Sequence, residues 1–126
     1  MPLTTAGSQF LAKAATGLNS PTLFSAANCY LGVGDSSTAF STSQTDLQAS
    51  TNKSRVLCTS IAESSGVLTI VGTWGTSVGN FEWLEHGIFN ASSGGTMLGR
   101  KVESPSLGTK TSASVWTLTV TGTFSA

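Results

Sequence analysis

The sequence predicts an all-β protein: a single-domain antiparallel β-sandwich or jelly-roll-like barrel. Two observations support this prediction. Apolar and hydroxyl-bearing residues alternate with a period of two in the clearest segments, and such segments recur about every ten residues between clusters of Gly, Ser, Asn and Asp. The 126 residues are enough for one domain, and the 39% of hydrophobic residues are enough to give it a buried core.

The segment 115–124 shows the alternation most clearly. Its apolar side chains alternate with threonines, so that one face of a strand is apolar and the other carries hydroxyls. The apolar face consists of Trp116, Leu118, Val120 and Phe124. Similar patterns predict further strands, about six in all, at residues 30–33, 55–61, 66–74, 81–89 and 97–102.

Turn-forming residues separate the predicted strands. Glycine supplies positive φ, and the Asp side chain caps nearby backbone N–H groups. Gly32, Gly34 and Asp35 are therefore predicted to form a tight turn. Gly94 and Gly95 are predicted to close a hairpin between the strands at 81–89 and 97–102.

The first 28 residues show little alternation, which predicts an extended amino-terminal arm (1–28) ahead of the sandwich domain (29–126). One short helix is expected within the arm at residues 9–15, with Ser8 as N-cap and Gly17 as the stop. If the arm reaches a neighbouring subunit, its apolar side chains are the candidate partner-binding residues. These are Phe10, Leu11, Leu18, Leu23 and Phe24.

Charge is scarce and balanced. Charged residues make up 10% of the chain and the formal net charge is zero, which favours a component of an assembly over a freely diffusing monomer. The six basic residues are dispersed, so no nucleic-acid partner is expected. No run approaches the roughly 18 apolar residues of a membrane helix, and the amino terminus does not resemble a secretory signal, so no membrane partner is expected either.

The chain has few groups suited to catalysis. Its single histidine, His86, lies near Glu82 and Glu85 in the sequence. Strand alternation places His86 and Glu82 on one face and Glu85 on the other, and two side chains on one face are too few to bind zinc. No Gly-x-Ser-x-Gly motif is present. We therefore expect no catalytic residues, no metal and no cofactor, and a protein that is not an enzyme. A small hydrolase built on His86 and a serine is the least favoured alternative.

Several residues allow two interpretations. Arg55 and Glu85 lie inside predicted strands and either form a buried ion pair or occupy the rim separately. Cys29 and Cys58 are predicted to be buried free thiols, although a disulfide is open to them if their segments share a sheet. The three tryptophans either belong to the core or stack on sugars in a carbohydrate-binding module.

One ordered set of motifs resembles a known family. It consists of Gly32-Val33-Gly34-Asp35, Gln44-Thr45-Asp46-Leu47, Arg55, Trp83-Leu84-Glu85-His86-Gly87-Ile88-Phe89-Asn90 and Gly95-Thr96-Met97-Leu98-Gly99-Arg100. Their order resembles the amino-terminal domain of tail-collar and tail-fibre proteins of tailed bacteriophages, and also small head decoration proteins. The resemblance covers residues 31–101, a little over half of the chain.

The resemblance implies a virion structural protein. The leading expectation is a capsid decoration (cement) protein on the capsid surface, made in the cytoplasm of the bacterial host. Its implied partners are the major capsid protein and copies of itself, as a homotrimer that clamps neighbouring capsid subunits. The alternatives are a tail, collar or neck component of the virion, or a carbohydrate-binding module.

Overall fold

The computed structural model describes residues 1–124 of the chain. They form one helix, α1 (Thr5–Thr16), followed by seven strands. The strands are β1 (Tyr30–Gly34), β2 (Lys53–Leu57), β3 (Ser60–Ser64), β4 (Val67–Trp74), β5 (Glu85–Phe89), β6 (Met97–Val102) and β7 (Trp116–Thr123).

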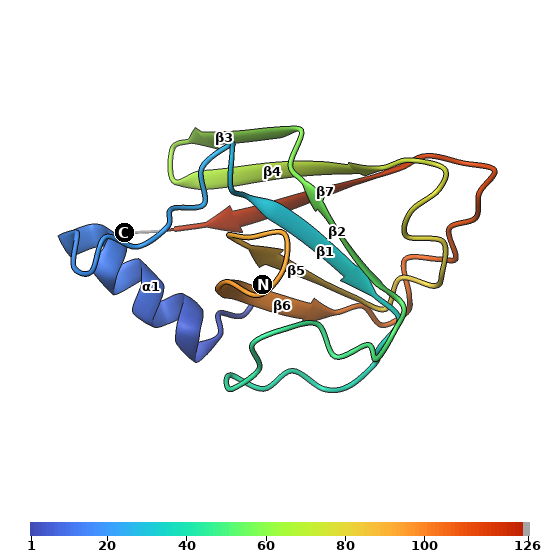
Figure 1. Ribbon diagram of the computed structural model, residues 1–126, viewed down its shortest axis with the longest axis horizontal. Coiled ribbons are helices and arrows are strands. Elements are labelled where there is room, and N and C mark those ends of the chain that lie inside the picture. The colour runs from blue at the N-terminus through green and yellow to red at the C-terminus, as the bar shows by residue number, and fades with distance from the viewer. Residues whose placement is uncertain (125–126) are drawn as a thin grey trace.

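The strands form two antiparallel sheets, ordered β2-β1-β5-β6 and β3-β4-β7. The two sheets share one hydrophobic core, so the predicted all-β sandwich architecture is confirmed (Figure 1). The first sheet contributes Leu31, Val33, Ile88 and Leu98 to the core, and the second contributes Ile70, Trp74 and Val120. The predicted alternation in β7 holds for Trp116, Leu118 and Val120, which point inward while the threonines between them are exposed. It does not hold for Phe124, which lies beyond the end of β7 and is 55% exposed.

Two predicted strands have different bounds in the structure. Residues 55–61 belong to two strands, because the chain passes from one sheet to the other between Leu57 and Ser60. The N–H of Cys58 still bonds to the first sheet at Cys29, whereas that of Thr59 bonds to the second at Val71. Of the segment 81–89, only Glu85–Phe89 forms a strand.

Residues 81–84 instead pair with the loop at 107–110. Trp83 donates its N–H to the carbonyl of Gly108, and its own carbonyl accepts from Leu107. This apolar stretch is therefore buried by a loop, which strand alternation does not predict.

The amino-terminal segment differs most from expectation. Residues 5–16 are not extended but form α1, which is longer than predicted and packs against β6. The N-cap is Thr4 rather than Ser8: its hydroxyl accepts from the N–H of Gly7 at 2.9 Å and donates to the carbonyl of Met97 at 2.5 Å. Gly17 ends the helix in the left-handed region (φ 68°), as predicted.

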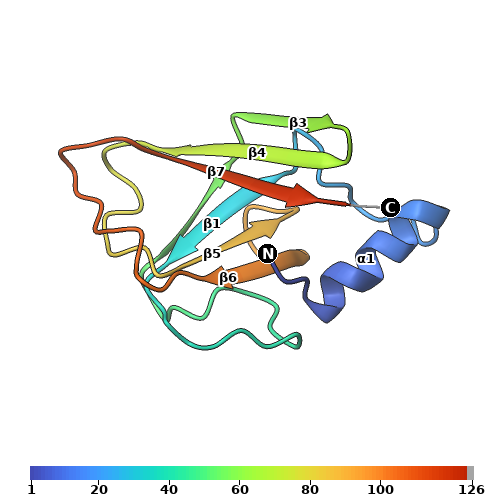
Figure 2. The same ribbon diagram turned by 180° about the vertical axis from the view of Figure 1, so that it is seen from behind.

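Two of the long connections lie at the end of the sandwich away from the helix. Figure 2 shows α1 at one end of the sandwich and the loops 75–84 and 103–115 at the other end. The loop 35–52, between β1 and β2, runs along the β6 side of the first sheet in both views. This loop covers the face of that sheet that points away from the core.

Candidate functional site

A buried ion pair lies on the outward face of the first sheet. Arg100 of β6 donates from Nε to Glu85 Oε2 of β5 at 2.5 Å, and both side chains are fully buried. Both interpretations of Arg55 and Glu85 are therefore wrong: the two do not pair, and Glu85 is not a rim charge but half of a different buried pair. In the β5–β6 register Gly87 faces Arg100, and Glu85 lies two residues from Gly87 on the same face, so the two charged side chains meet diagonally.

The ion pair anchors the loop 35–52. Glu85 also accepts from the backbone N–H groups of Gln48 at 2.9 Å and Ala49 at 2.8 Å. Arg100 donates to the side-chain oxygen of Gln44 at 3.1 Å and to the carbonyl of Thr38 at 2.9 Å. Burying two charges is costly unless further hydrogen bonds satisfy them, and the loop supplies those bonds.

Arg55 belongs to a second ion pair above the same face. Its guanidinium donates to Asp46 at 3.0 Å and lies 3.5 Å from the centre of the Phe89 ring. It also donates to the carbonyls of Ala91 and Gly94 in the β5–β6 turn. Partial burial on its own would raise the pKa of Asp46, but hydrogen bonds from Lys53 and Arg55 outweigh it and hold that pKa below its usual value.

Some of the predicted turn residues lie in a turn, and others lie in a strand. Gly94 and Gly95 adopt positive φ (60° and 67°) in the turn between β5 and β6, as predicted. Gly32 and Gly34 are strand residues of β1 rather than part of a turn, so that prediction is wrong. A Cβ at Gly34 would collide with the carboxylate of Glu85, so its role is to make room for the ion pair. Asp35 follows β1, and its carboxylate accepts from the Asn52 side chain at 2.8 Å.

Sequence reasoning missed Arg100 as the partner of Glu85. The available signal was a charged residue inside the apolar strand 97–102, the same kind of signal that singled out Arg55. Gln44 and Asp46 were noted only as parts of a motif. Their contacts with the two arginines depend on the path of the loop 35–52, which has no periodicity to predict it.

His86 lies on the inward face of the first sheet, opposite to Glu85. Its Nδ1 is 3.1 Å from Glu103 Oε1 but outside hydrogen-bonding geometry. Burial lowers the pKa of His86 to about 4, against the opposing effect of Glu103 and assisted by Lys101. The ring is therefore neutral near pH 7. No group of three or more metal-binding side chains occurs within residues 1–124.

The tryptophans are packed together rather than displayed. Trp74 and Trp83 are almost fully buried, and Trp116 is half-buried beside them. Their rings meet edge to face, with centroids 4.9 Å apart for Trp74 and Trp83 and 5.0 Å apart for Trp83 and Trp116. A flat, exposed stacking platform for sugars is therefore not formed by these three residues.

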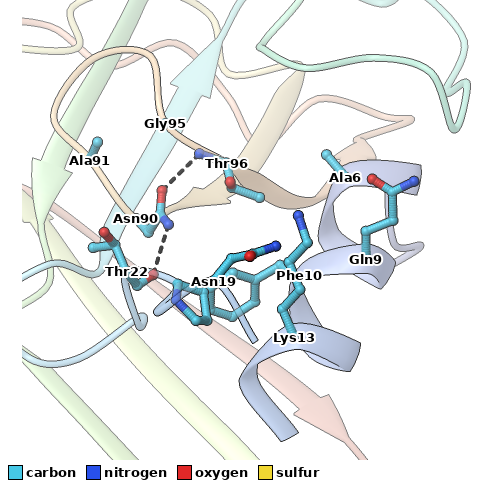
Figure 3. Close-up of a pocket in the computed structure, with 11 residues that line it drawn as sticks. Ala6, Gln9, Phe10, Lys13, Asn19, Thr22, Asn90, Ala91, Gly95 and Thr96 are labelled. Carbon is cyan, nitrogen blue, oxygen red and sulfur yellow. Dashed lines mark hydrogen bonds between the residues drawn. The ribbon is translucent and has the colours of Figure 1, made fainter. Parts of the chain in front are cut away.

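A polar groove of about 480 Å³ lies between α1 and the β5–β6 turn (Figure 3). Gln9 and Lys13 line it from the helix, and Thr96 lines it from the turn side. Asn90 joins its two sides: it donates to the carbonyl of Thr22 at 2.8 Å and accepts from the N–H of Thr96 at 2.7 Å. The lining includes Lys13 and no acidic residue.

The predicted partner-binding residues divide into two groups. Phe10 is buried and meets Phe24 edge to face at 4.8 Å, and both Phe24 and Leu11 pack against the core. These three therefore stabilise the packing of the amino-terminal segment on its own domain. Leu18 and Leu23 are 62% and 55% exposed and are the ones open to a partner.

Comparison with protein-family models, with curated proteins and with solved structures finds no match to the chain. Within residues 1–124 the helix is too short to span a membrane.

Proposed function

We propose that this chain is a structural protein of a tailed-phage virion, acting as a capsid decoration protein that clamps neighbouring capsid subunits. The proposal rests on the ordered motif resemblance and on the packing of the residues that carry it. In this role the chain binds the major capsid protein and copies of itself, as a trimer on the capsid surface. A tail, collar or neck component is the nearest alternative within the same class.

The observation that carries the proposal is the convergence of the resembling motifs. They come from five separate segments, and each segment contributes at least one residue to the outward face of the first sheet. Other motif residues, among them Val33, Ile88 and Leu98, face the core. Gly34 makes room for Glu85, Arg100 binds both Glu85 and Gln44, and Arg55 binds Asp46. Such mutual dependence is expected if the motifs form one structural unit, and the proposal requires them to do so.

Two surface features suit an assembly role. Strand β7 pairs with β4 on one side and with no strand among the described residues on the other. The segment 111–124 around it carries no charged residue, whereas edge strands of monomers are usually protected by charges, prolines or bulges. A strand added there by a neighbour would close that side of the sandwich toward a jelly-roll-like barrel.

The second feature is the exposed pair Leu18 and Leu23, which follows α1. In this proposal residues 1–28 form the clamp, with these two leucines as its contact points on a neighbouring subunit. Few charges are available on the chain, so association would depend on apolar burial and strand pairing.

The experiment is co-sedimentation of the purified protein with expanded capsids and, separately, with isolated tails of the phage that encodes it. Saturable binding to capsids is expected, at one trimer per local symmetry axis. Leu18→Asp combined with Leu23→Asp should weaken capsid binding at least tenfold, since both side chains would lose apolar contacts.

Val78→Asp is the matched control, because Val78 is 40% exposed in the loop 75–84 at the opposite end of the molecule. This variant should bind as the unmodified protein does. Binding to tails alone would move the assignment to the tail, and binding to neither particle would refute the virion role.

The groove beside α1 favours a second candidate, a carbohydrate-binding module. Its amide and hydroxyl side chains, including Gln9, Asn19 and Thr96, suit sugar hydroxyls, whereas the buried tryptophans do not contribute. A glycan array would test this candidate: a sugar ligand whose binding is lost in Asn19→Ala, without capsid binding, would replace the leading proposal.

A further inference from the structure

The two cysteines face each other across neighbouring strands. The β1–β2 register pairs Tyr30 with Leu57, so the next pair outward is Cys29 and Cys58. The N–H of Cys58 donates to the carbonyl of Cys29 at 2.8 Å, which continues the ladder to this position. Residues that face each other in an antiparallel ladder have Cα atoms about 4.5–5.5 Å apart, within the range of about 4.4–6.8 Å at which disulfides form.

Both sulfur atoms lie on the same side of the sheet. Strand alternation places Cys29 on the face of Leu31 and Val33, and Cys58 on the face of Val56. All of these residues belong to or pack against the one hydrophobic core between the sheets. The cysteine side chains therefore point in the same direction from facing backbone positions, which is the arrangement that a cross-strand bridge requires.

The surroundings of the two thiols differ. Cys29 is fully buried, whereas Cys58 is 8% exposed and contacts the carbonyl of Ala26 at 3.9 Å. Burial, and then the neighbouring Cys58 thiol, raise the pKa of Cys29 to about 12. Cys58 is therefore the thiol that a reagent in solution reaches first, and Cys29 lies behind it as the resolving thiol.

We propose that Cys29 and Cys58 are a disulfide site, oxidised by exchange with a low-molecular-weight disulfide such as oxidised glutathione. The Cys58 thiolate attacks the glutathione disulfide, forming a mixed disulfide and releasing one glutathione thiolate. The Cys29 thiol attacks the Cys58 sulfur and expels the second glutathione, and the proton of Cys29 goes to the departing glutathione thiolate. Two protein thiols are oxidised, and one glutathione disulfide is reduced to two thiols.

The bridge has a consequence for the outward face of the sheet. It closes a covalent loop that contains β1, β2 and the whole of the loop 35–52 between them. That loop supplies the hydrogen bonds to Glu85 and Arg100 described above. Oxidation therefore stabilises the ion-pair face against unfolding by restricting the unfolded chain. This inference is independent of the virion role.

The test is incubation of the folded, reduced protein with a glutathione redox buffer, followed by intact mass measurement under denaturing, acid-quenched conditions. A monomer lighter by about 2 Da is expected, since two hydrogens are lost. The chain has two cysteines, so an intramolecular bridge joins these two. The melting temperature of the oxidised protein should be roughly 5–15 °C higher and should return to its original value on reduction.

Cys29→Ala is the matched control, because it keeps the reachable thiol and removes the resolving one. It should accumulate a glutathione adduct at Cys58 and show no loss of 2 Da. Cys58→Ala should remain largely unmodified, because the remaining thiol is fully buried.

Circular dichroism and unfolding curves check that both variants fold. The unmodified protein by itself also tests whether the disulfide forms. If it stays fully reduced in the most oxidising buffer while the urea-unfolded chain oxidises, or if it gives only stable adducts or linked dimers, the proposal is overturned.

Discussion

At the scale of single residues, the buried ion pair of Glu85 and Arg100 is the feature that most needs compensating hydrogen bonds. Both side chains are fully buried, and between them they receive or donate five hydrogen bonds, counting the bond that joins them. Such a pair need not stabilise a protein more than apolar residues would. Its loss is nevertheless costly, because one partner would remain buried and uncompensated.

Glu85→Gln is therefore expected to lower the free energy of unfolding by about 3–5 kcal/mol, since Arg100 would keep its charge without a counterion. Urea unfolding followed by tryptophan fluorescence measures the loss. Glu82→Gln is the control: Glu82 is exposed, and within residues 1–124 its carboxylate accepts one hydrogen bond, from the Ser106 hydroxyl, so a change within about 0.5 kcal/mol is expected. Equal effects for the two variants would contradict the burial of the Glu85 charge.

Because His86 is buried, we expect the stability of the fold to depend on pH. Its pKa is lowered to about 4 in the folded protein, chiefly by burial, against about 6.5 in the unfolded chain. Between these values the unfolded chain binds more protons, so stability from this residue is complete above pH 6.5 and falls as the pH drops toward 4. Unfolding curves at pH 7.0 and 4.5 should differ by a few kcal/mol.

The variant His86→Gln should lose most of this dependence above pH 4.5, where the carboxylates contribute little. Lys13→Gln is a suitable control, because Lys13 is exposed on α1, is not one of the charges that shift the pKa of His86, and leaves the titrating imidazole in place. An unchanged pH profile in His86→Gln would show that another group is responsible.

At the scale of elements, strand β1 requires a glycine at position 34 because of its neighbour and not because of its backbone conformation. Gly34 faces Glu85 across the β1–β5 pair, and the carboxylate occupies the space where a Cβ would stand. Gly122, in β7, provides the comparison, because a Cβ there meets nothing within 4 Å and its φ is ordinary for a strand.

Gly34→Ala is expected to destabilise the fold by about 1–3 kcal/mol, because the carboxylate must move away from Arg100 or from the loop. Gly122→Ala should be neutral or stabilising by up to about 1 kcal/mol, since alanine restricts the unfolded chain. Chemical denaturation of the two variants measures both effects. A loss of equal size at both positions would point to general strand effects instead of the ion pair.

At the scale of the whole molecule, the free edge of β7 is the feature most open to association. A lysine on an edge strand opposes pairing with a strand of another copy, because its charge would be desolvated there without a counterion. Thr121→Lys is therefore expected to shift the proposed trimer toward monomer by at least tenfold in dissociation constant, measured by analytical ultracentrifugation.

Thr76→Lys adds the same charge in the exposed turn after β4 and should leave the assembly unchanged. If the unmodified protein is monomeric at every concentration, β7 is not an edge for self-association. If instead both lysine variants dissociate equally, the effect is one of net charge.

The sequence alone determined the fold class and much of its inner layer. Alternation in residues 66–74 and 115–124 predicted strands whose inward side chains do form the core, because a half-buried strand must present apolar residues at every second position. Gly17, Gly94 and Gly95 were correctly placed at a helix end and a turn, since positive φ there favours glycine.

Only the tertiary structure decided which charges meet. Arg55 and Arg100 give the same signal in sequence, yet Arg100 pairs with Glu85 and Arg55 with Asp46. The strand register and the path of the loop 35–52 make this choice, and both are set by contacts between distant segments. The helix α1 was underestimated for the same reason: its anchor is the bond from Thr4 to Met97, 93 residues away. The local periodicity of a sequence does not predict contacts between segments that are distant in the chain.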